Sequence, residues 1–132
     1  MKAFIDTNIF IYALEKHPQF GIKSKNILGR VDTAEIQAST STLTLKEICW
    51  YLEADKKFPE MREAMKKILN SQIKIIQISP SEILKAAQLK QRFPHIEIND
   101  LINYTIMKRN QISTVFTNDR HFDKLSDVKR TF

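Results

Sequence analysis

The N-terminal sequence Lys2-Ala3-Phe4-Ile5-Asp6-Thr7-Asn8 predicts a buried strand that is followed at once by a helix. Ala3 to Ile5 form a short apolar run, which is typical of a strand inside a sheet. The polar residues that follow are of the types that cap helix N-termini. We therefore expect a strand over residues 2–5 and a helix over 8–16, which ends before Pro18.

The rest of the chain repeats this alternation of short apolar runs and segments of helical periodicity. Further strands are predicted over 36–39, 73–78, 114–116 and 128–131. The segment 73–78 has four isoleucines in six residues and is expected to be a central strand, and 128–131 an edge strand. Helices are predicted over 22–31, 41–54, 59–69, 81–93, 98–109 and 121–125. Strands separated by helices imply an α/β fold with a parallel sheet and right-handed crossovers.

Length and composition predict one ordinary globular domain over residues 1–132. Hydrophobic residues make up 42% of the chain and charged residues 27%. A lone cysteine, Cys49, excludes an internal disulfide, and the absence of a Cys/His cluster argues against a structural zinc module. No stretch has the apolar length of a membrane span, and Asp6 interrupts any signal-peptide core, so we expect a cytoplasmic protein with no membrane partner. The net charge of +6 favours an anionic partner such as nucleic acid.

Two acidic residues stand where catalytic groups gather in parallel α/β proteins, and two further acids lie on predicted helices. Asp6 and Asp119 each follow a predicted strand, although either one alone is typical of a helix cap. Glu47 lies on the inward face of its helix, and Asp100 lies in the first turn of another. If the four carboxylates converge, each pair 4 Å apart repels by about 4 kcal/mol, and a divalent cation would remove that conflict. Hard oxygen ligands favour Mg²⁺ or Mn²⁺ over Zn²⁺.

At these residues the sequence resembles the PIN domain family, and within it the VapC-type ribonuclease toxins of toxin–antitoxin pairs. The resemblance spans essentially the whole chain in the expected order. Its motifs are Phe4 to Tyr12, the helix around Glu47, Ile98 to Ile102, and Val115 to Phe122. It implies a three-layer α/β/α sandwich around a mostly parallel sheet.

The resemblance also implies roles for individual residues. Asp6, Glu47, Asp100 and Asp119 match the acidic quartet that binds Mg²⁺ or Mn²⁺ and catalyses RNA hydrolysis. Thr7, Asn8 and Thr117 match polar residues with positioning roles. Independently of the resemblance, the guanidinium of Arg120 beside Asp119 suits a contact with a substrate phosphate. The implied protein is a metal-dependent endoribonuclease with an RNA substrate, a cognate antitoxin protein as partner, and a homodimeric state.

Other functions remain open at this point. The chain could be a free-standing RNA-processing PIN nuclease or a non-catalytic module that binds RNA or a protein partner. A phosphoacceptor receiver domain is disfavoured because Thr7, and not a second acid, follows Asp6. A haloacid-dehalogenase-like phosphatase would need an acid where Asn8 stands.

The proposed acidic cleft changes the charge that is expected for the rest of the surface. Assigning four of the 15 acids to a cleft leaves 11 against 21 basic residues, a balance of +10 elsewhere. We therefore expect a basic surface around an acidic cleft whose formal charge of −4 two Mg²⁺ ions would offset. His17, His95 and His121 are each isolated in the sequence and are expected to be surface or loop residues.

Overall fold

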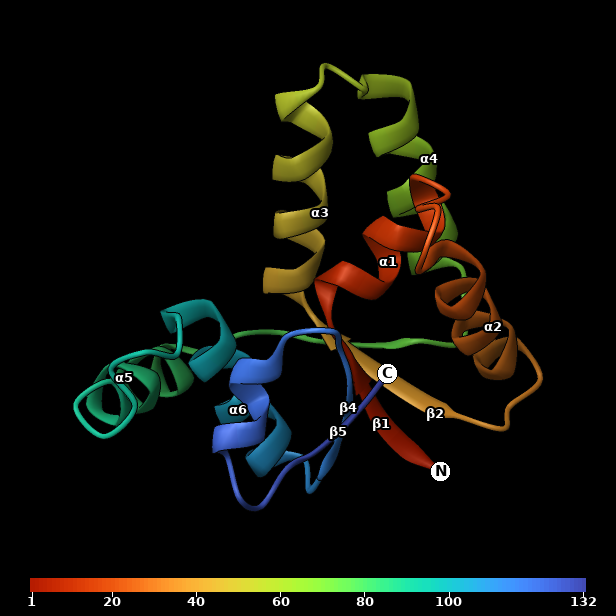
Figure 1. Ribbon diagram of the computed structural model, residues 1–132. Coiled ribbons are helices and arrows are strands. Elements are labelled where there is room, and N and C mark those ends of the chain that lie inside the picture. Colours follow the sequence, from red (N-terminus) through yellow and green to blue (C-terminus); the bar gives the residue numbers. More distant parts are fainter.

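A computed structural model describes all residues from Met1 to Phe132 (Figure 1). The strands are β1 Lys2–Ile5, β2 Gln37–Ser41, β3 Lys74–Ile76, β4 Thr114–Phe116 and β5 Lys129–Thr131. The α-helices are α1 Thr7–Leu14, α2 Gly21–Asp32, α3 Thr42–Ala54, α4 Phe58–Leu69, α5 Pro80–Leu89 and α6 Ile98–Arg109, and a 3-10 helix η1 spans Arg120–Lys124. None of the helices has the length and apolar character that crossing a membrane requires.

The five strands form one sheet in the order β3-β2-β1-β4-β5, and all four pairings are parallel. Side chains of β1 alternate between its two faces, as the strand geometry dictates. Ala3 and Ile5 enter a core with helices α1 to α4, whereas Phe4 enters a second core with α5 and α6. Figure 1 shows these two groups of helices on opposite sides of the sheet. The predicted three-layer parallel α/β/α sandwich is confirmed.

The isoleucine-rich segment 73–78 is not a central strand, and that prediction is wrong. Its strand, β3, lies at one edge of the sheet and pairs only with β2. Ile73 nevertheless packs with the core that contains α4, while Ile76 packs with the core that contains α5. Helices cover both faces of this edge strand, so its apolar content reflects face burial and not a second neighbouring strand. The predicted edge strand at 128–131 is confirmed as β5.

Helix α1 ends two residues earlier than predicted because a tight turn follows it. Lys16 adopts a positive φ of 50°, and the Nδ1 atom of His17 accepts the backbone N–H groups of Gln19 and Phe20, both at 3.1 Å. Gly21 is required where the chain returns, because a Cβ there would lie 3.0 Å from the carbonyl carbon of Lys16. This turn fixes His17 beside the carboxyl end of β1.

Candidate active site

The pairing of β1 with β4 places two polar side chains next to each other at the carboxyl edge of the sheet. Ile5 pairs with Phe116, so the residues that follow, Asp6 and Thr117, are neighbours. The backbone N–H of Asp6 donates to the carbonyl of Phe116 at 3.1 Å, and the Thr117 hydroxyl donates to Asp6 Oδ2 at 2.7 Å. Both side chains are at least 95% buried, so the network holds Asp6 in one orientation.

Asn8 extends this network to the last acidic residue. Its side-chain amide donates to Thr117 Oγ1 at 2.9 Å and to Asp6 Oδ2 at 3.3 Å. Its oxygen accepts the backbone N–H of Asn118 at 3.1 Å, and Thr117 Oγ1 accepts the backbone N–H of Asp119 at 3.0 Å. The loop after β4 is thereby tied to the loop after β1, which brings Asp119 toward Asp6.

Glu47 reaches the same edge from the second turn of α3. The Thr7 hydroxyl donates to Glu47 Oε1 at 2.8 Å, and the side-chain amide of Asn99 donates to Oε2 at 3.4 Å. Each oxygen of this carboxylate therefore has a donor from a different element, one from α1 and one from α6.

A buried polar contact joins the helices that carry Glu47 and Asp100. Ser41 caps the N-terminus of α3 by accepting the backbone N–H of Thr44 at 3.2 Å. The same Ser41 hydroxyl donates at 2.7 Å to Oδ1 of Asn103, which lies one turn after Asp100 on α6. The contact fixes the N-terminal turns of the two helices against each other.

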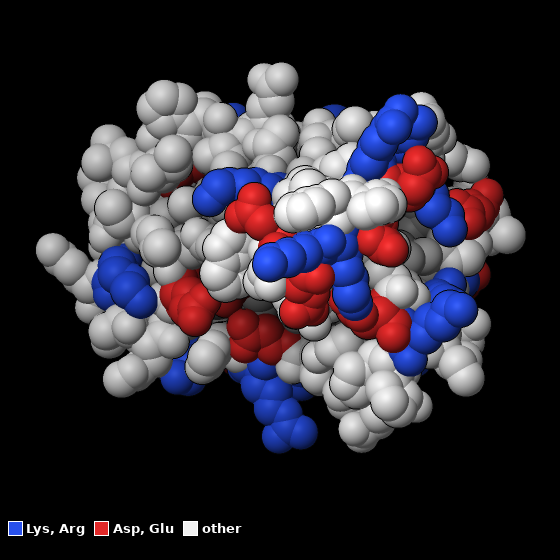
Figure 2. Space-filling view, turned by 90° about the horizontal axis from the view of Figure 1, so that it is seen from above, with Lys and Arg blue, Asp and Glu red and all other residues white.

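These groups line a cleft of about 360 Å³ that contains six acidic residues and neither lysine nor arginine. Its lining consists of Asp6, Thr7, Asn8, Ile11, Tyr12, Glu15, His17, Glu47, Tyr51, Glu97, Asp100 and Asp119. This lining agrees with the expected acidic cleft, whereas the expected basic surface concerns the residues around it. Figure 2 shows Lys and Arg mixed with Asp and Glu over the face in view, in place of a continuous basic ring.

Burial and neighbouring charge raise the pKa of two of these carboxyl groups, Asp6 and Asp100. Burial raises the pKa of Asp6 to about 6, although hydrogen bonds from Thr117 and Thr7 oppose the shift. Burial, together with the charges of Asp6, Asp119 and Glu47, raises the pKa of Asp100 to about 9. Without a cation, the cluster therefore retains a proton at neutral pH.

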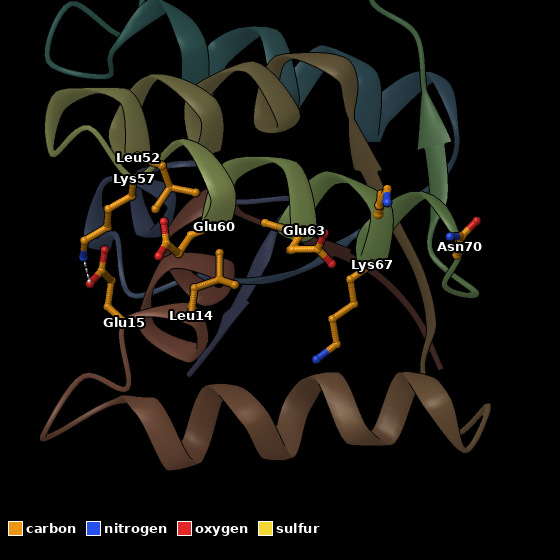
Figure 3. A pocket seen from close by; sticks show the side chains of 10 residues that line it. Leu14, Glu15, Leu52, Lys57, Glu60, Glu63, Lys67 and Asn70 are labelled. Carbon is orange, nitrogen blue, oxygen red and sulfur yellow. Dashed lines mark hydrogen bonds and ion pairs between the residues drawn. The ribbon is translucent and has the colours of Figure 1, made fainter.

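A larger pocket of about 700 Å³ lies beside this cleft and has a different chemical character (Figure 3). Three glutamates in its lining are matched by three lysines, and Lys57 Nζ lies 2.7 Å from Glu15 Oε2. Glu15 lines both cavities. The charges of the larger pocket are balanced. Of these two cavities, the acidic cleft alone has an excess of negative charge that a cation would offset.

A sequence model of the PIN domain matches residues 3–128. The chain belongs to the PIN domain family. This match covers both strand ends and both helices that supply the cleft carboxylates. Comparison with curated protein sequences gave no match.

Solved structures with the same fold include VapC proteins. VapC20 of Mycobacterium tuberculosis, described as a sarcin-ricin loop cleaving toxin, is 14% identical, with a TM-score of 0.80 and coverage of 93% of this chain and 94% of that one. VapBC2 of Rickettsia felis, bound to a promoter DNA fragment, is 21% identical, with a TM-score of 0.73 and coverage of 99% and 98%. A toxin–antitoxin complex from Klebsiella pneumoniae is 20% identical, with a TM-score of 0.70 and coverage of 96% and 94%. These similarities support the fold of this PIN domain.

The structure brings together most of the residues that the sequence singled out. Those in the cleft lining are Asp6, Thr7, Asn8, Glu47, Asp100 and Asp119. Thr117 lies fully buried beneath Asp6 and bonds to it. Arg120 is exposed at the start of η1 and is not part of the cleft lining, so the structure gives no support to its predicted phosphate contact.

Three residues at or near the cleft were not predicted. His17 and Glu97 line the cavity, and His121 lies beside Asp119 without being part of the lining. His17 lies in a loop and His121 is exposed, as expected, but both stand close to the acidic residues. For His121, the spacing of two residues from Asp119 at a helix start was a usable signal, because a capping carboxylate bonds the backbone of that residue. Glu97, which precedes Ile98 at the N-terminus of α6, carried no such signal.

The donor set fits a hard divalent cation. Burial and the charges of three neighbouring carboxylates keep the pKa of Asp100 high, and a cation would relieve this unfavourable charge balance. The oxygen atoms are those that Mg²⁺ and Mn²⁺ prefer. Asp6, Glu47, Asp100 and Asp119 are the residues that would hold such an ion.

Thr117 offers a test of how Asp6 is positioned. Thr117→Val keeps the shape of the buried side chain but removes the hydroxyl that donates to Asp6. We expect Mg²⁺ affinity, measured by titration calorimetry, to fall about 10-fold, as for loss of a group that orients a metal ligand. Thr117→Ser retains the hydroxyl and should bind Mg²⁺ like the wild type. Equal affinity of Thr117→Val and wild type would contradict the positioning role.

Proposed function

We propose that this PIN domain is a divalent-metal-dependent endoribonuclease and the toxin of a VapBC-type toxin–antitoxin pair. The observation that carries the proposal is the convergence of Asp6, Glu47, Asp100 and Asp119 on one cleft without a lysine or arginine. Such a cluster is unfavourable for a module that only binds RNA, because the carboxylates repel phosphate. It is suited to a site that takes up metal ions before an anionic substrate.

The proposed chemistry divides between the metal and the protein. Mg²⁺ or Mn²⁺, when bound, lowers the pKa of a water ligand and stabilises negative charge on the phosphodiester. Asp6, held by Thr117 and Asn8, provides a fixed ligand. Glu47 is oriented by Thr7, so its carboxylate cannot turn away from the cleft.

The similar structures support the finer parts of the proposal. One of them names a toxin that cleaves the sarcin-ricin loop, which supports RNA as the substrate class. Others describe toxins in complex with antitoxins, which supports an antitoxin protein as the partner. A homodimeric state is proposed from the family resemblance.

The decisive experiment compares two Asp→Asn variants in an RNA-cleavage assay with Mg²⁺. Asp6→Asn should reduce the rate by at least about 100-fold, because loss of even an orienting group costs a metal site 10- to 100-fold. Asp32→Asn, at an exposed acid on α2, serves as the matched control and should cleave like the wild type. Expression of the wild type, but not of Asp6→Asn, should arrest cell growth.

One outcome would overturn the nuclease activity of this cleft, and another would overturn only the toxin role. Cleavage by Asp6→Asn at the wild-type rate would show that the activity does not come from this cleft. Cleavage without growth arrest would retain the nuclease but favour a free-standing RNA-processing enzyme over a toxin.

A further inference from the structure

His121 stands beside Asp119 because of the way η1 begins. Asp119 caps this short helix, and its Oδ1 accepts the backbone N–H of His121 at 2.9 Å. That bond brings the imidazole to the same side, where Nδ1 lies 3.1 Å from the same Oδ1. The imidazole is 48% exposed and is therefore reachable from solvent.

The imidazole and two carboxylates converge. One ring nitrogen of His121, one oxygen of Asp100 and one oxygen of Asp119 all lie within 4.8 Å of one another. Ligand atoms on opposite sides of one ion, each about 2.2 Å from it, are about 4.4 Å apart. Three such atoms can therefore reach a common cation with small side-chain movements.

The chemical nature of the third ligand affects which ion is preferred. Mg²⁺ is bound almost entirely through oxygen and keeps several waters, whereas imidazole is a good ligand for first-row transition metals. Mn²⁺ is suited to carboxylate oxygens such as those of this cleft and, as a first-row transition metal, binds imidazole better than Mg²⁺ does. A site with both ligand types therefore discriminates between two ions that carboxylates alone would treat alike.

We propose that the His121 imidazole is a ligand of the metal held by Asp100 and Asp119, and that it makes the site prefer Mn²⁺ to Mg²⁺. This inference rests on the metal-binding part of the proposed function. It assigns His121 a direct contact with the ion, beyond the hydrogen bond that its backbone makes to Asp119.

His17 provides an internal comparison. It also lines the cleft, but its Nδ1 already accepts two backbone N–H groups, and it is not among the three converging side chains. Its Nδ1 is thus committed to the turn after α1. His95 is exposed and lies outside the cleft lining. These two histidines are the matched controls for His121.

The test is pulsed electron paramagnetic resonance of the full chain loaded with Mn²⁺. We expect a ¹⁴N coupling in the wild type that disappears in His121→Gln and persists in His17→Asn and His95→Gln. Titration calorimetry should show that His121→Gln loses about 10-fold in Mn²⁺ affinity, while Mg²⁺ affinity changes by less than about threefold.

The possible failures are distinguishable. Mn²⁺ that binds in a manner dependent on Asp100 but without ¹⁴N coupling would overturn the role of His121 and leave the proposed function intact. A coupling that survives in His121→Gln, or an equal loss of Mg²⁺ and Mn²⁺ affinity, would also overturn it. Failure of the wild type to bind either ion would overturn the proposed metal site itself.

Discussion

Asp100→Asn is expected to reduce Mg²⁺-dependent RNA cleavage by at least about 100-fold while making the metal-free protein more stable. The two effects have opposite signs because the Asp100 carboxylate binds the metal but destabilises the folded protein when no metal is present. Burial and three neighbouring carboxylates raise the pKa of Asp100 to about 9, so its ionised form is unfavourable in the folded state. The neutral amide removes this penalty, and with it a metal ligand.

The gain in stability should be on the order of 2 kcal/mol at pH 7, since one unit of pKa shift corresponds to 1.4 kcal/mol and the site is partly solvated. Urea denaturation in EDTA measures the stability, and a single-turnover assay measures the cleavage. Asp32→Asn is the control for both. A variant that loses stability together with activity would indicate that Asp100 supports the fold and not the chemistry.

The metal-free protein should become less stable as the pH rises from about 4 to about 8. Asp6 and Asp100 have raised pKa values of about 6 and about 9 in the folded state. Above pH 4 the unfolded chain releases both protons, whereas the folded protein keeps them, so folding is linked to proton uptake. Stability therefore falls with pH, up to about pH 6 through both groups and beyond it through Asp100 alone.

The expected decrease is at least about 2 kcal/mol across this window, in urea denaturation series containing EDTA. Asp123 and Asp127, whose pKa values are lowered by Arg130 and Lys108, act in the opposite direction but only near and below pH 4. Saturating Mg²⁺ should flatten the profile because it binds the ionised carboxylates. Asp100→Asn should lack the decrease above pH 6. A free energy of unfolding that does not change with pH in EDTA would contradict the raised pKa values of Asp6 and Asp100.

Much of the architecture follows from local patterns in the sequence. The apolar run before Asp6 and the capping residues after it predict β1 and α1, and the observed strand has the predicted bounds. Helix α6 and strand β4 were also predicted at their observed residues, because polar residues follow the apolar residues of each segment. The four acids could be proposed for one cleft because two of them follow strands of a parallel sheet.

Other features depended on contacts that no local pattern encodes. The apolar residues of 73–78 predicted burial correctly but not the position of β3 at an edge, since helices on both faces bury a strand as well as neighbouring strands do. The basic excess of the composition did not predict where lysines lie, and the cleft lining contains none. Surface charges have no periodicity that would assign them to one site.

The sequence by itself determined the order of strands and helices, the parallel α/β class, and which acidic residues follow strands or begin helices, because these depend on interactions between residues close in the chain. Only the tertiary structure decided that Thr117 bonds Asp6, that Glu47 is held by donors from α1 and α6, and that His121 joins Asp100 and Asp119. Each of these contacts depends on strand register or helix packing, which long-range burial fixes across the whole chain.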